Sequence, residues 1–82
     1  MENWITLDLV PFGNKAQVRS IRAEGAMRRR LMDLGFTPGA ETTPILSAAA
    51  GDPRAYSIRG TVIALRNATA KEITVFPAWE GA

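Results

Sequence analysis

Two residue types are absent from this chain of 82 residues: it contains no cysteine and no histidine. Their absence excludes a zinc finger, an iron–sulfur cluster, an imidazole metal site and a disulfide-stapled fold. It also leaves no histidine general base and no cysteine nucleophile. Carboxylate-only chemistry stays open, but the eight Asp and Glu residues are scattered along the chain. We therefore expect a protein that is not an enzyme and holds no metal or cofactor.

Long apolar runs are also lacking. No stretch approaches the roughly 18 apolar residues of a membrane span, and the first residues do not resemble a signal peptide. The net charge is only +2, and aromatic residues make up 7% of the chain. These features predict a single cytoplasmic domain over residues 1–82, and they give little support to a nucleic-acid partner.

Residues 26–34 have the pattern of a short amphipathic helix. Met27, Leu31 and Leu34 recur at i, i+4 and i+7, which predicts one apolar stripe that packs in the core. Gly35 follows where a left-handed C-terminal cap belongs. A helix of this length is marginal alone, so we expect it to dock on the rest of the domain.

Short strands and turns occupy most of the remaining chain. Alternation of polar and apolar residues, or enrichment in β-branched residues, predicts extended segments. Pro44 has no N–H to donate, so we expect its strand at an edge or a bulge. Asn67 is a candidate N-cap for one helical turn. The predicted strands are residues 15–21, 41–46, 54–58, 61–66 and 73–76, and the helical turn is 67–72. So many short strands in so small a chain predict a closed or nearly closed barrel.

An arginine triplet at residues 28–30 is the densest charge cluster. Its plain interpretation is the solvated face of the helix, and its functional interpretation is a patch for an acidic protein surface or for phosphates. Small nucleic-acid binders usually place aromatics beside such arginines, and the nearest aromatic in sequence is Phe36. Asp52, within Gly51-Asp52-Pro53, is a single carboxylate in a turn, which we interpret as a cap of its own backbone rather than a metal ligand.

The order of these motifs resembles the FeoA family, small cytoplasmic accessory proteins of bacterial ferrous-iron transport. Residues 27–39, MRRRLMDLGFTPG, resemble the family's arginine-rich helix followed by Leu-x-Asp/Glu-Leu-Gly-hydrophobic-x-x-Gly. Residues 51–53, 59–66 and 70–75 resemble the later family motifs in the same order. The resemblance covers residues 5–76 and leaves 77–82 as a loose C-terminal tail.

The resemblance implies a mainly β, SH3-like small barrel of five strands, with one short α-helix inserted after the first long strand. It also implies a partner, the cytosolic GTP-binding part of a FeoB-like membrane transporter. The implied role is a non-enzymatic adaptor or regulator of bacterial ferrous-iron uptake. Such a protein is cytoplasmic, is not itself inserted in the membrane, and would be recruited by its partner to the inner membrane face.

For the partner contact we expect Arg28 and Arg29 to meet acidic groups, with Met32, which lies off the apolar stripe, and Phe36 as apolar anchors. Arginine and aromatic residues in small desolvated pockets dominate many interfaces. The alternative is a small-barrel nucleic-acid-binding protein, whose affinity would fall steeply with salt. An iron carrier is disfavoured because ferrous iron usually recruits nitrogen or sulfur ligands. Exposed edge strands of two copies can also pair with each other, so a homodimer stays an alternative.

Overall fold

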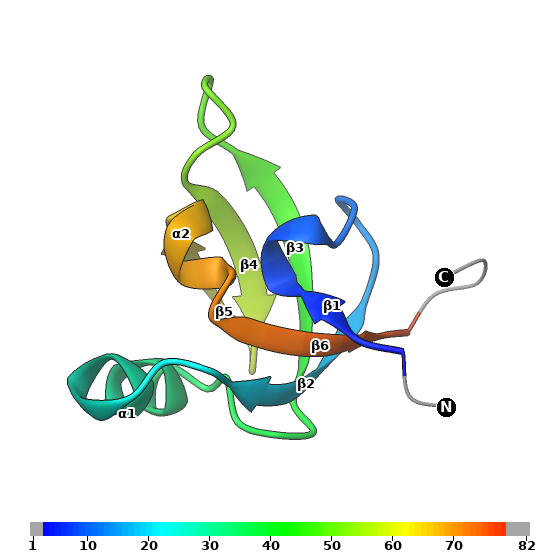
Figure 1. Ribbon diagram of the computed structural model, residues 1–82. Coiled ribbons are helices and arrows are strands. Elements are labelled where there is room, and N and C mark those ends of the chain that lie inside the picture. The colour runs from blue at the N-terminus through cyan, green and yellow to red at the C-terminus, as the bar shows by residue number, and fades with distance from the viewer. Residues whose placement is uncertain (1–2, 79–82) are drawn as a thin grey trace.

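The computed structural model describes residues 3–78, and it is mainly β, as the sequence predicts. Among these residues, six strands form one antiparallel sheet in the order β1-β6-β2-β3-β4-β5 (Figure 1). In chain order the elements are β1 (Ile5–Thr6), the 3-10 helix η1 (Leu7–Leu9), β2 (Ala16–Ile21), α1 (Gly25–Asp33), β3 (Glu41–Ser47), β4 (Arg54–Ile58), β5 (Thr61–Leu65), α2 (Asn67–Ala70) and β6 (Ile73–Pro77).

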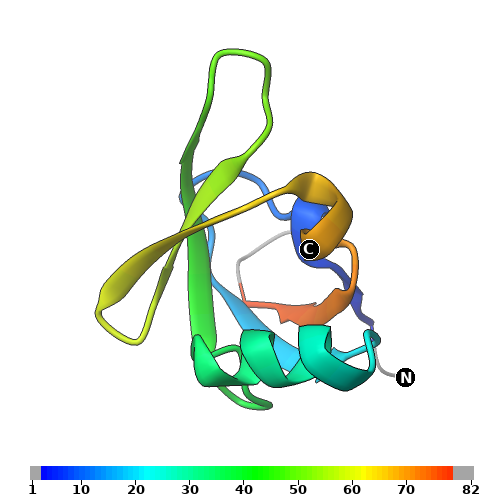
Figure 2. The same ribbon diagram turned by 90° about the vertical axis from the view of Figure 1, so that its left-hand side faces the viewer.

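The strand count is one higher than predicted because β1 is a strand of only two residues. Ile5 lies opposite Val75 of β6, so the two ends of the domain are joined in the sheet. Two residues are too few to show an alternating pattern in the sequence. The sheet curls around the core without closing, since β5 and β1 lie at opposite edges. Figure 2 shows the open side, where β5 runs from its hairpin turn towards α2 with α1 below it.

The predicted helical turn forms as α2, but its cap is not the predicted one. The side chain of Asn67 makes no cap, and its backbone N–H instead donates to the carboxylate of Asp52 at 2.9 Å. A negative charge at a helix N-terminus is favourable. Asp52 therefore caps the backbone of a distant segment instead of that of its own turn, which was the prediction, and this contact links the β3–β4 loop to α2.

The sequence predicts an edge or a bulge at Pro44, and the structure has the bulge, within an interior strand. The β3–β4 register shifts between Pro44 and Leu46, and β3 lies between β2 and β4. However, β2 pairs with β3 only as far as Thr42, and beyond it the Pro44 carbonyl accepts the N–H of Gly13 at 2.9 Å. Pro44 thus occupies a place where β2 does not require its missing N–H.

The C-terminal end of β6 extends beyond its predicted limit. Pro77 lies opposite Ala16, and the N–H of Ala78 donates to the carbonyl of Lys15 at 3.1 Å. Pro77 therefore belongs to the sheet and Ala78 is hydrogen-bonded to its edge, although the sequence assigned both to a loose tail. The remainder of that predicted tail, residues 79–82, lies outside the described residues.

The core lies inside the curl of the sheet. Met27, which was predicted to lie in the core, lies outside it. Met27 is 41% exposed, whereas Leu31 is 1% exposed and Leu34 is partly buried. Helix α1 reaches the core with its C-terminal half, so the first residue of the predicted stripe lies outside. The largest fully buried side chains are Tyr56, Phe36, Leu7, Leu31, Ile58, Ile73, Val10, Val18 and Val75.

A buried arginine holds the start of the chain against the sheet. Arg54 is 8% exposed and shares the inward face of β4 with Tyr56 and Ile58. Its guanidinium donates to the main-chain oxygens of Asp8 and Val10, the latter at 2.7 Å. Charge-assisted bonds of this kind are stronger than neutral ones, so Arg54 fixes η1 in place.

Candidate functional site

Helix α1 stands beside the sheet rather than inside its curl (Figure 1). Its link to β2 is reinforced by Arg28, whose Nη1 donates to the main-chain oxygen of Ile21 at 2.8 Å. Within the helix, Leu31 is the buried residue. Two faces of α1 remain accessible. We call them the outer face, made of Arg28, Arg29 and Met32, and the inner face, made of Met27, Arg30, Leu31 and Leu34.

The outer face surrounds an open hollow of about 460 Å³. Its lining residues are Gly25, Arg28, Arg29, Met32 and Asp33. Three of the four residues predicted to contact a partner therefore lie together. Met32 is partly buried and packs against the core, so only part of its side chain is available to a partner. The hollow therefore combines the Arg29 guanidinium and a partly covered thioether with the Asp33 carboxylate and with Arg28, whose guanidinium also binds Ile21.

Phe36, the fourth predicted contact residue, is 0% exposed and belongs to the core. The helix ends in a Schellman motif, in which the Gly35 N–H donates to the Met32 oxygen and the Phe36 N–H to the Leu31 oxygen, at 3.0 and 3.1 Å. This motif usually brings the residue after the glycine against the last buried turn. The prediction of Phe36 as a surface anchor is therefore wrong, since the cap directs its side chain inward.

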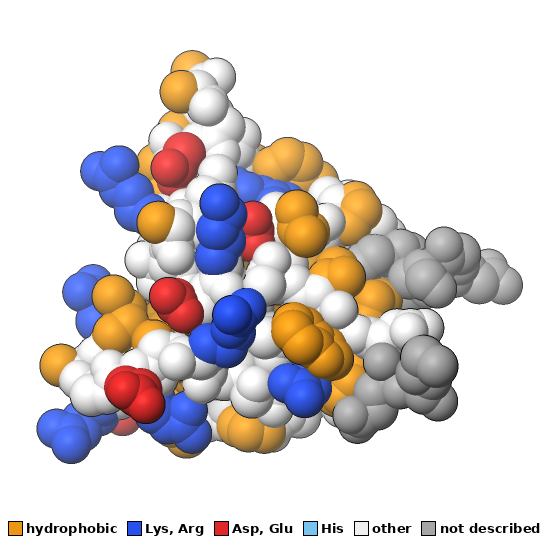
Figure 3. Space-filling model, in the orientation of Figure 1, with side chains coloured by type: hydrophobic (Ala, Val, Ile, Leu, Met, Phe, Trp, Pro, Cys, Tyr) orange, Lys and Arg blue, Asp and Glu red, His pale blue; other side chains and the backbone are white. Residues whose placement is uncertain are grey.

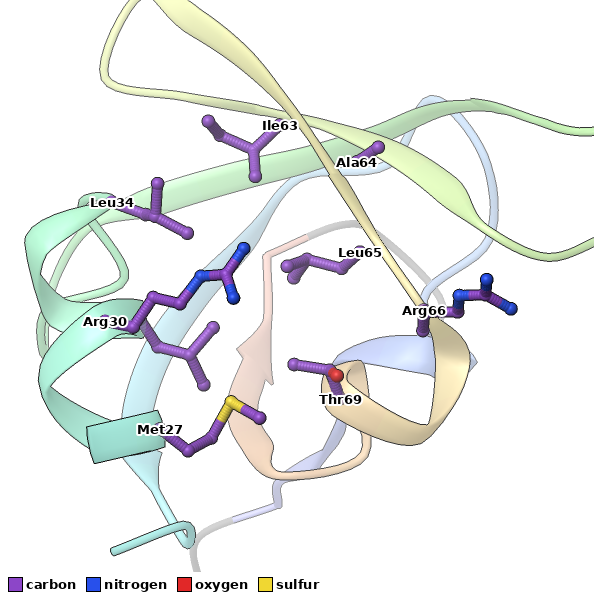
Figure 4. A pocket seen from close by; sticks show the side chains of 9 residues that line it. Met27, Arg30, Leu34, Ile63, Ala64, Leu65, Arg66 and Thr69 are labelled. Atoms are coloured by element: carbon purple, nitrogen blue, oxygen red, sulfur yellow. The ribbon is translucent and has the colours of Figure 1, made fainter. Parts of the chain in front are cut away.

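The inner face borders a narrow slit of about 250 Å³ between α1, β5 and α2 (Figure 4). Apolar side chains from α1 and β5 dominate its walls, and the Arg30 side chain lies over it, whereas that of Arg66 projects away from it past the end of β5 (Figure 4). Its lining residues are Met27, Arg30, Leu31, Leu34, Ile63, Ala64, Leu65, Arg66 and Thr69. The slit combines an apolar interior with one positive charge beside it, that of Arg30.

Arg59 fixes the distance between α1 and the β4–β5 hairpin. It occupies a hairpin turn with φ of +49°, and its Nε donates to the Gly35 oxygen at 3.3 Å. Its Nη2 donates to Oγ1 of Thr37 at 2.6 Å. A cation at a helix C-terminus also interacts favourably with the helix dipole. The slit therefore has a defined width, set by contacts at one end.

The slit was not predicted from the sequence, although the sequence contains part of the pattern that forms it. Alternation along residues 61–65 already places Ile63 and Leu65 on one face. Nothing in the sequence shows that this face meets α1, because the contact joins segments about 30 residues apart. Arg66 gave no signal either, since a lone arginine after a strand is common.

The groups around the hollow and the slit are guanidinium, thioether and aliphatic side chains, with the carboxylate of Asp33 at the hollow and the hydroxyl of Thr69 at the slit, and this combination suits binding. Within residues 3–78, no three His, Cys, Asp or Glu side chains are grouped so as to hold a metal ion. In the same part of the chain, no helix has the length and apolar character needed to cross a membrane. Burial raises the pKa of the Tyr56 hydroxyl, and the nearby Arg54 guanidinium offsets part of this rise.

The family model for the FeoA domain matches residues 5–77. The chain belongs to the FeoA family. The match agrees with the resemblance found in the sequence, and structures of FeoA proteins support the SH3-like fold. No curated protein matches the chain at a significant level.

Solved FeoA structures superpose on most of this FeoA-family chain. FeoA from Chlorobium tepidum is 36% identical with a TM-score of 0.86, over 95% of this chain and 74% of that one. A FeoA-like protein from Clostridium acetobutylicum is 35% identical with a TM-score of 0.88, over 100% and 95%. The zinc-complexed FeoA of Stenotrophomonas maltophilia is 33% identical with a TM-score of 0.77, over 87% and 88%. That protein is described as a procaryotic SH3 domain protein and is suggested to be a ferrous iron transport activating factor.

Proposed function

We propose that this chain is a non-enzymatic adaptor of bacterial ferrous-iron uptake. It acts in the cytoplasm by binding the cytosolic GTP-binding part of a FeoB-like membrane transporter. Membership of the FeoA family supports this role, as does the activating role suggested for the Stenotrophomonas maltophilia relative. The observation that carries the proposal is helix α1, which stands beside the sheet and presents arginines and apolar side chains on two accessible faces.

The outer face of α1 provides the electrostatic part of the contact. Arg29 and Met32 line the same hollow, so one partner segment can meet a guanidinium and a thioether together. Arg28 also lines it, but its guanidinium binds Ile21 and helps to hold the helix. Figure 3 shows acidic side chains interspersed with the basic ones at the lower left, over α1. Recognition is therefore local, because the surface does not present a field of one sign.

The decisive experiment is a titration of the purified chain against the cytosolic GTP-binding domain of its own organism's FeoB-like transporter. The domain is loaded with GDP or with a non-hydrolysable GTP analogue, at low and at high salt. Saturable binding supports the proposal. A difference between the nucleotides identifies a regulator that senses the GTPase state, and equal binding identifies an adaptor. Absence of binding in every condition overturns a direct contact with this domain.

A mixed-sequence RNA oligonucleotide in the same assay tests the nucleic-acid alternative. Stacking on bases requires accessible aromatics beside the arginines. Phe36, the aromatic closest in sequence to the triplet, is buried and cannot stack on a base. We expect no saturable RNA binding at physiological salt. Tight, steeply salt-dependent RNA binding would show instead that the chain is a nucleic-acid-binding protein.

A further inference from the structure

Strand β5 has an open outer edge. It pairs with β4, and the strand order places it at the end of the sheet. No strand within residues 3–78 covers its other side. The opposite edge strand, β1, has only two residues, and very short edge strands resist pairing with other chains. β5 has five residues, TVIAL, without the proline or lysine that often protects an edge.

The hairpin geometry shows which backbone groups face outward. Arg59 and Gly60 form a two-residue turn with φ of +49° and +79°, and Ile58 lies opposite Thr61. Residues that flank such a turn exchange ladder hydrogen bonds, and the next pair does not. The N–H and C=O groups of Val62 and Ala64 therefore point away from β4. Val62 is 60% exposed and Ala64 is also exposed, so an incoming strand can reach these groups.

The slit lies directly beside this edge. Ile63 and Ala64 belong to both the strand and the slit lining, and the volume of about 250 Å³ has room for an apolar side chain or two. Arg30 lies over it, and Arg66 follows the end of β5 with its side chain directed away from the slit (Figure 4). A strand that pairs with β5 would thus place apolar side chains near the slit, meet the positive charge of Arg30 there, and end near Arg66 beyond β5.

We propose that β5 accepts an extended segment of the partner protein as an additional strand of the sheet. The segment has an apolar side chain that enters the slit, an Asp or Glu residue that meets Arg30 there, and a second one that meets Arg66 beyond the end of β5. Main-chain hydrogen bonds to Val62 and Ala64 supply affinity, and the slit supplies specificity. The inference rests on the proposed function, since the segment would belong to the cytosolic part of the transporter.

Charge favours an acidic partner over a second copy of this chain. Antiparallel pairing of two β5 strands about Ile63 would bring Arg59 of one copy near Arg66 of the other. Parallel pairing in register would place the two Arg66 residues side by side. Like charges facing each other across strands are destabilising. An acidic segment has the opposite effect at the same positions.

The test uses Ala64→Pro, with Ala64→Val as its matched control. Proline removes the outward N–H of residue 64 and leaves the β4 ladder intact, because that N–H does not face β4. Valine keeps the N–H and suits a strand. We expect proline to weaken binding to the cytosolic GTP-binding domain by about tenfold or more, and valine by less than about threefold. In the unmodified chain, hydrogen exchange at the Val62 and Ala64 amides should slow on complex formation.

The outcomes separate this inference from the proposed function. If the unmodified chain binds, the proline variant binds equally well and the two amides stay unprotected, strand addition is overturned while the adaptor role stands. If the unmodified chain does not bind at all, both proposals fall. Dimerisation of the chain alone that Ala64→Pro abolishes, with partner binding unaffected, would assign the edge to a second copy. The amide measurement decides the matter even if the proline variant does not fold.

Discussion

The two faces of helix α1 differ in what surrounds them. The outer face borders an open hollow of about 460 Å³ and carries Arg28 and Arg29. The inner face borders a slit of about 250 Å³ whose far wall is β5. On the outer face, charge acts through solvent and is screened within roughly 10 Å at 0.1 M salt. On the inner face, apolar contact and main-chain pairing act only at short range.

This difference indicates that one short helix can use one face to set the rate of association and the other face to set the affinity of the complex. Charges at the rim of an interface mainly change the rate of association and its salt dependence. Buried apolar anchors and hydrogen bonds mainly change dissociation. The two faces should therefore respond differently to mutation and to salt. The four predictions below run from the largest expected effect to the smallest.

Leu31→Ala should loosen α1 from the core and so disrupt its outer and inner faces together. Leu31 is 1% exposed and is the residue through which α1 is anchored in the core. Truncation of such a leucine costs about 2–5 kcal/mol of the free energy of unfolding. Met27→Ala in the same helix removes a side chain that is 41% exposed and should cost far less. Urea unfolding of both variants measures the difference, and equal losses would show that α1 is not held by Leu31.

Gly35→Ala should disturb the inner face more than the outer one. The backbone at Gly35 has φ of +114°, and an added Cβ would lie 3.1 Å from Cδ of Arg59 and 3.2 Å from Cγ1 of Ile58. The left-handed conformation costs an alanine roughly 1–2 kcal/mol, and this crowding adds to it. Because Arg59 sets the width of the slit, partner binding should weaken as well as stability.

Gly39→Ala is the matched control for that prediction. Gly39 also has a positive φ, +90°, but an added Cβ there meets nothing within 4 Å. It therefore bears the conformational cost without the crowding. Thermal unfolding should rank Gly35→Ala as the less stable variant. The reverse ranking would show that the contact between the helix end and the hairpin is not tight.

Arg29→Glu should act through the outer face and depend on salt. Arg29 lines the hollow, is exposed and accepts the change without loss of a described hydrogen bond. Association with the transporter domain should slow by about tenfold at low salt, and the effect should shrink as salt is added. Stopped-flow kinetics measures both. Lys15→Glu makes the same charge change just before β2, at the end of that strand far from α1, and should alter association much less.

Much of this fold follows from local sequence, and the rest depends on long-range contacts. Leu31, Gly35 and the strand pattern are visible because periodicity and capping are local. The inward position of Arg54 is visible too, since it shares the alternation of Tyr56 and Ile58. The two-residue β1 and the slit were not predictable, because each exists only through pairing with a distant segment.

Candidate contact residues follow the same rule. The arginine triplet is a local pattern, and the structure places Arg28, Arg29 and Met32 around one hollow as grouped in the prediction. Phe36 looked similar in sequence, but the cap at Gly35 turns it into the core. Helical periodicity no longer applies beyond the cap, so the direction of the next side chain depends on the turn geometry rather than on spacing.

Tyr56→Phe should have the smallest effect at neutral pH. The ring lies in the core opposite Ile63 of β5, with 0% exposure, and within residues 3–78 its hydroxyl has no hydrogen-bond partner. Loss of an unsatisfied buried hydroxyl should change stability by less than about 1 kcal/mol, in either direction. The slit and the outer face should be unaffected, so partner binding at pH 7 should equal that of the unmodified chain.

At alkaline pH, the stability of the Tyr56→Phe variant should differ from that of the unmodified chain. Burial raises the pKa of Tyr56 above its ordinary value of 10.0, so the unfolded chain loses this proton more readily than the folded chain. Stability is therefore complete below about pH 10 and falls as the pH rises towards the pKa of the folded state. Tyr56 is the single tyrosine of the chain, so phenolate absorbance reports it alone. Denaturant unfolding of the phenylalanine variant should not show this alkaline loss of stability, because nothing at position 56 then ionises. An equal loss of stability in the variant and in the unmodified chain would place its origin elsewhere in the chain.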